Sequence, residues 1–105
     1  MKIDILTIFP EAFSYFDYSI PKIAQQKKLI DIKIHDLRKW ANNKHNRVDD
    51  KPFGGGAGMV LMLEPIYRAI KELKTEESRV ILTSAQGVLW DQKKALQLFK
   101  IIILI

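Results

Sequence analysis

RVDDKPFGGGAGM, residues 47–59, separates two halves of this chain that are each patterned as alternating strands and helices. Four of the five glycines lie between Gly54 and Gly58, so the backbone there is free to adopt positive φ and to lie close to another molecule. Two adjacent carboxylates, Asp49 and Asp50, come shortly before them. A solvated surface loop is the simpler interpretation, but paired acids, a proline, an aromatic residue and a glycine cluster together favour a functional loop.

Basic side chains surround these two acids. They are Arg38, Lys39, Lys44, Arg47 and Lys51, with His45 among them. The whole chain has a formal net charge of +5, which permits a polyanionic partner such as nucleic acid, because Lys and Arg release counterions when they contact phosphate. Many basic proteins bind no nucleic acid, so the charge alone does not identify the partner.

Length and composition are those of one ordinary globular domain. The chain has 105 residues, of which 48% are hydrophobic and 28% charged. It has no cysteine, which excludes disulfides, thiolate metal sites and a cysteine nucleophile, and makes the cytoplasm the default location. The apolar run at the N-terminus is interrupted by Asp4 and ends at Pro10, so it is too short for a signal peptide, and no segment resembles a membrane span.

The first half predicts two strands around a helix. Lys2–Phe9 is nearly continuous in β-branched and apolar residues, as in a buried strand, and the aromatic residues of Pro10–Tyr18 are expected to pack in the core beside it rather than to stack on bases. Ser19 is the expected cap of the helix. Leu29–His35 alternates strictly, which predicts a strand near the sheet edge with one wet face, where His35 is solvated rather than a ligand.

The second half predicts two further helices and two strands. Asp36–Pro52 loses the apolar pattern and is too long for a simple connector, so we expect a functional or disordered loop. A helix is expected to open at Glu64–Pro65, followed by a strand over Arg79–Ser84. Asp91 is a natural N-cap of the next helix, and Ile101–Ile105 has the composition of a buried strand.

This alternating α/β order predicts a parallel sheet with right-handed crossovers. Ligands of such sheets bind beyond the carboxyl ends of the strands, where we expect both the glycine cluster and the loop Ser84–Gly87. Neither loop is a known phosphate cradle, because Gly58 is followed by Met59-Val60 rather than by Lys and Ser or Thr. A nucleoside triphosphate site is therefore disfavoured.

Other site chemistries have weaker support. His45 with Asp49 and Asp50 has donors suited to a hard cation such as magnesium, although two exposed carboxylates are more often simply solvated. A Ser-His-Asp arrangement cannot be argued from only two histidines. A dedicated metal site and a hydrolytic triad are thus both disfavoured.

The block His45–Met59 resembles the signature of the bacterial tRNA (guanine-N1)-methyltransferase family, TrmD. The segments Ile8–Phe13, Asp36–Arg38 and Thr83–Gly87, with Gln92 after them, follow in the order typical of that family, so the resemblance covers essentially the whole chain. Phe53 stands where the family usually has tyrosine and Ala85 where it usually has proline. The first removes a hydroxyl group and the second loosens a turn.

The resemblance implies a fold of the SPOUT class. Such proteins are cytoplasmic homodimers with a Rossmann-like parallel sheet, helices on both faces and a deep trefoil knot, followed by a helical C-terminal domain that grips tRNA. Residues 1–105 would be the N-terminal part of the SPOUT methyltransferase domain, truncated before the knot and without the tRNA-binding domain. No membrane association is implied.

The resemblance also implies methyl transfer from S-adenosylmethionine to N1 of the guanine 3′ of the anticodon. Asp49 would be a supporting catalytic acid, with the principal base expected beyond residue 105, and a magnesium requirement stays open. The implied cofactor-binding residues are Leu82, Thr83, Ser84, Ala85, Gln86 and Gly87. The implied tRNA-binding residues are His45, Arg47, Asp50, Lys51, Gly54, Gly55 and Gly56.

A second hypothesis is a non-catalytic RNA-binding or dimerisation module derived from the same family. An apolar strand at the end of the chain is what a shortened enzyme would leave, and this fragment is expected to be inactive alone. The coding sequence downstream of residue 105 would distinguish a truncated enzyme from a module.

Overall fold

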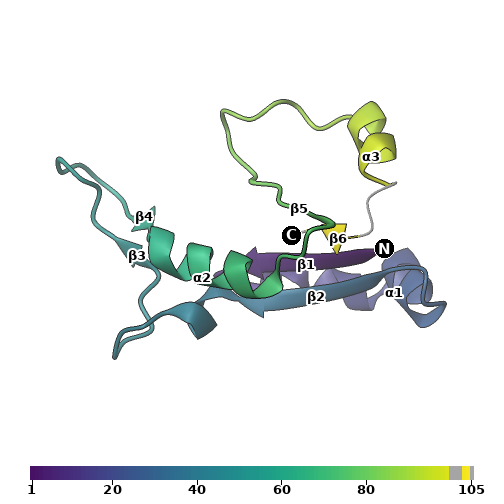
Figure 1. Cartoon of the computed structure of the whole chain (residues 1–105), viewed down its shortest axis with the longest axis horizontal. Coiled ribbons are helices and arrows are strands. Elements are labelled where there is room, and N and C mark those ends of the chain that lie inside the picture. Colours follow the sequence, from purple (N-terminus) through teal and green to yellow (C-terminus); the bar gives the residue numbers. More distant parts are fainter. Residues whose placement is uncertain (100–102, 105) are drawn as a thin grey trace.

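The computed structural model describes residues 1–99 and 103–104, and its centre is a four-stranded sheet with the order β2-β1-β6-β5 (Figure 1). These strands are β1 (Lys2–Thr7), β2 (Asp31–Asp36), β5 (Ser78–Arg79) and β6 (Ile103–Leu104). All three neighbouring pairs are parallel, as the alternating pattern predicts. A separate antiparallel ribbon, which the sequence pattern does not predict, joins β3 (Asp49–Asp50) to β4 (Val60–Leu61).

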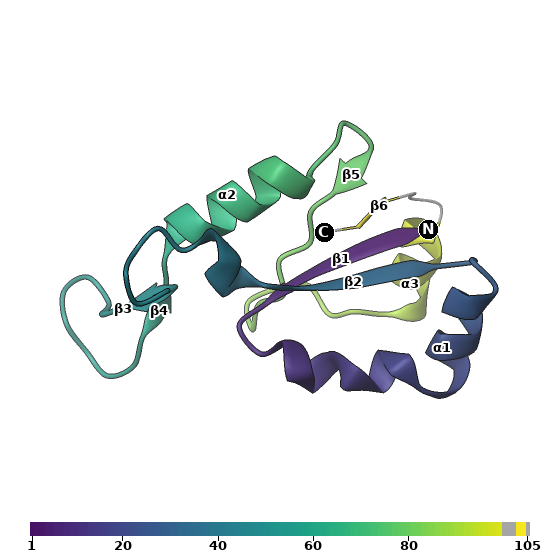
Figure 2. The ribbon, with the colours of Figure 1, turned by 90° about the horizontal axis from the view of Figure 1, so that it is seen from below.

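Helices lie on both faces of the sheet. They are the 3₁₀ helices η1 (Pro10–Asp17) and η2 (Leu37–Trp40), and the α-helices α1 (Ser19–Gln26), α2 (Leu63–Leu73) and α3 (Gln92–Leu98). Figure 2 shows α2 on one side of β1 and β2, and η1 with α1 on the other. The protein is thus a mixed α/β fold. Among the described residues, no helix is long and apolar enough to cross a membrane.

The long pairing of β1 with β2 forms the frame of the molecule. Lys2 lies opposite Asp31 and Thr7 opposite Asp36, so six consecutive residues are paired in register. The β-branched isoleucines of both strands suit this pleated arrangement. β2 is at the edge of the sheet, as its alternating pattern predicts, while β1 is paired on both sides.

The buried core lies at the carboxyl end of this frame. Its fully buried apolar members are Leu37, Val48 and Ala69, and Leu6, Ile8, Trp40, Ala41 and Ile66 pack against them. The Trp40 indole Nε1 also donates a hydrogen bond of 2.6 Å to Glu72 Oε2, which links η2 to α2. The segment that leads to the candidate glycine loop is therefore attached, through Val48, to the buried core of the described residues.

This core contradicts one of the two alternatives for Asp36–Pro52, that it is a disordered loop. The segment contains η2 and β3, and among the described residues it contributes two of the three buried apolar residues of the core, Leu37 and Val48. The Asp36 carboxylate starts η2 by accepting the Arg38 backbone N–H at 2.9 Å. Two apolar residues are enough to fix this segment to the core, because Leu37 and Val48 are both buried in one cluster with Ala69 of α2.

The aromatic segment also differs from its prediction. Phe13, Tyr15 and Phe16 pack on one another, with the Tyr15 and Phe16 ring centroids 4.2 Å apart. None of the residues of η1 is fully buried, and Tyr15 is 55% exposed. These aromatic rings pack on one another instead of in the core. The reason is that η1 lies over the sheet, and no further layer covers it in the described part of the chain.

The structure confirms one predicted helix start, shifts a second by one residue and corrects the predicted cap of a third. Asp91 caps α3 as predicted, since its Oδ1 accepts the Lys94 backbone N–H at 2.8 Å. α2 begins at Leu63, one residue before the expected Glu64. Ser19 is not the cap of α1, because it is the first helical residue, with a φ of 51°, and Tyr18 precedes it in extended conformation.

The third predicted strand is much shorter than expected. Arg79–Ser84 was predicted to be a strand, but β5 ends at Arg79 and the segment up to Asp91 is irregular. β5 pairs with β6 as far as Leu104, so a partner for Val80 would lie at residue 105, outside the described residues. Of the predicted strand Ile101–Ile105, the structure describes only β6, and residues 101, 102 and 105 lie outside the described part.

Candidate functional site

The glycine cluster forms the tip of the β3–β4 ribbon. Asp49 pairs with Leu61 and Asp50 with Val60, and the Met62 N–H donates to the Val48 carbonyl at 2.7 Å. Figure 1 shows this ribbon projecting past the carboxyl ends of β1 and β2, the edge where ligands of parallel sheets bind. The predicted position of this loop is therefore confirmed.

Backbone conformation, not crowding, is why this tip contains glycine. Gly54, Gly55, Gly56 and Gly58 have φ values of 84°, 80°, 122° and 97°. A Cβ atom at any of them would meet nothing within 4 Å. An L-residue would therefore fit the space but strain the left-handed backbone.

Apolar side chains are exposed along the same ribbon. Phe53 is fully exposed, and Met59, Val60, Leu61 and Leu63 are each about half exposed or more. An accumulation of exposed apolar side chains in one short segment makes the ribbon a candidate interaction surface. The ribbon thus combines an open backbone with apolar side chains that the described residues do not cover.

A basic loop precedes the ribbon and is closed by one side chain. Asn43 Oδ1 accepts the backbone N–H groups of His45 at 3.2 Å and Arg47 at 2.7 Å, and its Nδ2 donates to the Arg47 carbonyl at 2.8 Å. Asn46 completes the turn with a φ of 51° and an N–H bond of 3.0 Å to the Asn43 carbonyl. The side chains of Lys44, His45 and Arg47 all remain exposed.

Arg38, one of the cations of this region, is partly exposed but uses one guanidinium nitrogen inside the fold. Its Nη1 donates to the Ile8 carbonyl at 2.5 Å and lies 3.5 Å from Asp36 Oδ1. It therefore joins the start of η2 to the chain that leaves β1. Lys51 keeps an exposed side chain, and only its backbone N–H is used, by Asp50 Oδ1 at 2.8 Å.

Asp49 lies at the base of the ribbon and is half-buried, whereas Asp50 is exposed. The two carboxylates are neighbours in β3, so they point to opposite faces of the ribbon. Within residues 1–99 and 103–104, no three His, Asp or Glu side chains are grouped as metal ligands. The alternative of a magnesium site at His45, Asp49 and Asp50 gains no support from this geometry.

The predicted cofactor loop contains a built turn. The Gly87 N–H donates to the Ser84 carbonyl at 3.0 Å, and the Gln86 N–H to Ser84 Oγ at 3.2 Å. A Cβ on Gly87 would lie 3.0 Å from the Ser84 carbonyl oxygen, so glycine alone fits without displacement. Residues 82–87 are all exposed. The turn thus has a defined backbone and lies at the surface of the described structure.

The turn and the ribbon lie apart in the described part of the chain. Figures 1 and 2 show the ribbon at one end of the molecule and the segment after β5 along its side. The structure therefore brings together the basic loop and the glycine tip, but it does not bring Ser84–Gly87 to either of them.

A buried ionic cluster between β1 and β2 was missed by the sequence reasoning. Asp4 is 1% exposed, and its Oδ1 lies 2.7 Å from His35 Nε2 and its Oδ2 2.9 Å from Lys2 Nζ. His35 is therefore paired and not solvated, which corrects its predicted role. The available signal was Asp4 itself, the single charged residue between the apolar positions of a strand.

Two opposing effects act on the pKa of Asp4. Burial by itself raises the pKa of this carboxyl, but the hydrogen bonds and positive charges of His35 and Lys2 outweigh burial, and the pKa is held below its ordinary value of 3.8. The carboxylate therefore stays charged in the folded protein. The Asp4 carboxylate links β1 to β2 through its hydrogen bond with His35. The centroid of the His35 ring lies 6.0 Å from that of Trp40.

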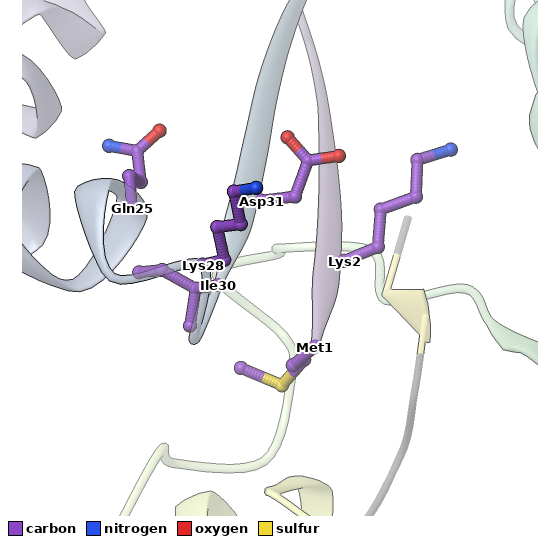
Figure 3. Close-up of a pocket in the computed structure, with 6 residues that line it drawn as sticks. All are labelled: Met1, Lys2, Gln25, Lys28, Ile30 and Asp31. Carbon is purple, nitrogen blue, oxygen red and sulfur yellow. The ribbon is translucent and has the colours of Figure 1, made fainter.

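A cavity of about 440 Å³ lies at the other end of the sheet. It is lined by Met1, Lys2, Gln25, Lys28, Ile30 and Asp31, around the amino ends of β1 and β2 (Figure 3). Figure 3 shows Lys2 extending away from Gln25, so the polar groups do not converge. This open cavity is opposite the candidate loops and is not part of the candidate site.

Fold and site together define an α/β protein whose basic loop and glycine ribbon extend beyond the carboxyl ends of parallel strands. Residues 1–105 match the family described as "tRNA (Guanine-1)-methyltransferase TrmD". The chain belongs to this family.

Curated relatives with this activity in their names are similar over most of the chain. A tRNA (guanine-N(1)-)-methyltransferase of Dictyoglomus turgidum is 52% identical over 101 residues, which are 95% of this chain and 41% of that protein. The protein of the same name from Staphylococcus haemolyticus is 50% identical, with 93% of this chain and 41% of that protein covered. The chain thus spans about two fifths of the length of these relatives.

Proposed function

We propose that this chain is the N-terminal part of the SPOUT domain of a tRNA (guanine-N1)-methyltransferase. The reaction is transfer of a methyl group from S-adenosylmethionine to N1 of the guanine 3′ of the anticodon. The observation that carries the proposal is the basic loop beside the glycine ribbon, in a chain that matches the family over its whole length. The knot and the tRNA-gripping domain belong, in this proposal, to the length of the relatives that the chain does not cover.

The reaction requires a base and a cation near the guanine. Guanine N1 carries a proton at neutral pH, so it becomes nucleophilic only when that proton is removed and the charge that develops on O6 is stabilised. Asp49 is suited to a supporting role, because β3 holds it half-buried between the exposed cations Arg47 and Lys51. The principal base is proposed to lie in the part of the enzyme outside this chain.

S-adenosylmethionine, when bound, would supply an electrophilic methyl group. Leu82, Thr83, Ser84, Ala85, Gln86 and Gly87 would hold one side of it, with the Ser84–Gly87 turn presenting backbone and hydroxyl groups. Ala85 leaves that turn with more freedom in the unfolded chain than the family's usual proline would. Residues of the full enzyme that lie outside this chain are proposed to cover the remaining sides of S-adenosylmethionine.

The tRNA-facing surface is proposed to consist of His45, Arg47, Asp50, Lys51, Gly54, Gly55 and Gly56. Exposed cations at the loop contact phosphates, while the open glycine backbone allows close approach of the anticodon arm. The homodimer and the cytoplasmic location that the family resemblance implies belong to the same proposal.

The test uses a longer polypeptide in which residues 1–105 replace the matching part of the Dictyoglomus turgidum relative, here called the extended protein. We expect it to methylate a tRNA transcript that carries guanosine 3′ of the anticodon, and not a matched transcript with adenosine there. Asp49→Asn should lower kcat by on the order of tenfold or more. No transfer, or equal transfer to both transcripts, would contradict the proposal.

A non-catalytic RNA-binding module is the second candidate. The separation of the Ser84–Gly87 turn from the ribbon favours it, because the cofactor loop and the RNA-facing loop do not meet within the described residues. This alternative predicts tRNA binding by the extended protein without any methyl transfer. The same pair of transcripts distinguishes the two functions.

A further inference from the structure

We propose that Asn43 is a positioning residue that holds a preformed phosphate-binding loop, an inference that rests on the proposed RNA-binding function. Its side-chain amide closes residues 43–47 and so presents Lys44, His45 and Arg47 together on one exposed loop. The ligand group is the phosphate backbone of RNA. Asn43 itself does not need to touch it.

The three hydrogen bonds of Asn43 use both ends of its amide. Oδ1 accepts from His45 and Arg47, and Nδ2 donates to the Arg47 carbonyl at 2.8 Å, so Arg47 is held through both of its backbone polar groups. Asn46 adopts a left-handed conformation with a φ of 51°, which asparagine tolerates better than most residues. The loop therefore has one defined backbone shape before any ligand binds.

This arrangement determines how the loop can recognise an anion. The N–H groups of His45 and Arg47 point to Asn43 Oδ1, and the N–H of Asn46 points to the Asn43 carbonyl. These backbone donors are already used inside the loop, so it is not a backbone nest for phosphate. Recognition must come from the side chains of Lys44, His45 and Arg47, and the charges of Lys44 and Arg47 make binding dependent on salt.

Both ends of the loop are fixed to the core independently of Asn43. On one side the Ala41 N–H donates to the Arg38 carbonyl at 3.1 Å, and on the other Val48 is 3% exposed and accepts the Met62 N–H at 2.7 Å. Removal of the Asn43 amide should therefore loosen residues 43–47 while the core stays folded. RNA binding would then have to order the loop, which lowers affinity without removing any cation.

The experiment measures binding of an unmodified tRNA transcript to the extended protein by fluorescence anisotropy at several salt concentrations. Asn43→Ala is expected to weaken binding by about tenfold, with the slope of log K against log salt unchanged, because every cation remains. Asn42→Ala is the matched control, since Asn42 is the neighbouring exposed asparagine, and its affinity should equal that of the wild type. Arg47→Ala should instead reduce the slope by about 0.9.

Asn43→Ser provides a partial rescue, since a serine hydroxyl can accept a backbone N–H as asparagine does, but more weakly. Its affinity should lie between those of Asn43→Ala and the wild type. Circular dichroism melting of each variant checks that the fold is intact. The same series on the chain alone gives a second measurement if the extended protein does not fold.

Affinity of Asn43→Ala within twofold of Asn42→Ala would overturn the positioning role, as would a slope reduced to that of Arg47→Ala. Loss of affinity in Asn43→Ala together with absent methyl transfer by the wild type would refute the proposed enzyme and leave the positioning role standing. Methyl transfer by the wild type, together with wild-type affinity of Asn43→Ala for tRNA, would support the proposed enzyme and refute the positioning role of Asn43. No measurable tRNA binding by the wild type would overturn both.

Discussion

At the scale of single residues, the Asp4 cluster shows how one buried charge connects two strands. The carboxylate accepts a hydrogen bond from His35 on β2 and forms an ion pair with Lys2 on its own strand, and its pKa is lowered in spite of burial. A pKa lowered by folding adds stability at pH values above the unfolded pKa, and this stability is lost as the pH falls through the folded pKa. Stability should therefore decrease below about pH 4.

Asp4→Asn is expected to destabilise the chain by about 2 kcal/mol at pH 7, because it removes the buried charge that accepts the His35 hydrogen bond and pairs with Lys2. The difference from the wild type should shrink as the pH is lowered toward 3, where the wild-type carboxylate is also being protonated. Urea unfolding followed by tryptophan fluorescence between pH 3 and pH 7 measures both effects. A difference in unfolding free energy that is constant over this range would show that the Asp4 charge does not contribute.

Two arginines close together in sequence should have separable roles. Both side chains are exposed, but the Arg38 guanidinium donates to the Ile8 carbonyl at 2.5 Å, whereas Arg47 is held in the described structure through its backbone groups. Arg38→Ala should thus lower stability by about 1–2 kcal/mol. Arg47→Ala should leave stability within about 0.5 kcal/mol of the wild type and weaken tRNA binding. Urea unfolding and anisotropy on both variants test this, and an exchange of the two effects would contradict it.

At the scale of elements, the glycine tip depends on left-handed backbone. Gly54 has a φ of 84° and free space where a Cβ would lie, whereas Gly87 would place a Cβ 3.0 Å from the Ser84 carbonyl oxygen. Substitution by alanine should therefore act through strain at the first position and through a steric clash at the second. The two sites provide a matched comparison of these costs.

Gly54→Ala is expected to cost roughly 1 kcal/mol of unfolding free energy, the usual penalty for an L-residue in this conformation. A D-alanine at Gly54, introduced by chemical synthesis of the chain, should restore the stability, since D-residues favour positive φ. Urea unfolding of the three forms is the measurement. Equal destabilisation by L- and D-alanine would indicate that the tip needs the absence of a side chain and not the backbone conformation.

The elements that sequence predicted best are those with their own periodic pattern. β2 follows directly from alternation, α2 from helical spacing and β1 from its run of apolar residues, and Asp91 marks the start of α3. The β3–β4 ribbon could not be found in this way, because a strand of two residues has no period. β5 is defined by its pairing with β6, and such a pairing between distant segments cannot be read from the residues of Arg79–Ser84 alone.

The candidate site shows the same limit. The exposed cations and the glycine tip were predictable from composition, and the structure confirms that glycines there adopt positive φ. The Asn43 hydrogen bonds, the commitment of Arg38 to Ile8 and the Asp4–His35 pair depend on side-chain geometry across several residues or strands. Linear sequence patterns carry no signal for such contacts.

At the scale of the whole molecule, the described residues bury few apolar side chains completely and leave many exposed. Leu82, Val88 and Leu89 are each more than 80% exposed, and Trp90 is 59% exposed. All four belong to the segment that contains the proposed cofactor turn. That segment therefore has defined local hydrogen bonds but little enclosure around it.

The chain alone is accordingly expected to show no measurable binding of S-adenosylmethionine. A ligand of this size is usually held in a pocket that covers about 70–90% of its surface, and its affinity depends on groups that are already in place. The Ser84–Gly87 turn offers one such wall, and residues 82–87 are exposed along their whole length. Isothermal titration calorimetry of the chain alone and of the extended protein provides the comparison, with binding expected only for the second. Micromolar binding by the chain alone would mean that the Ser84–Gly87 turn closes on the cofactor without help, and the proposed division of the site would be wrong.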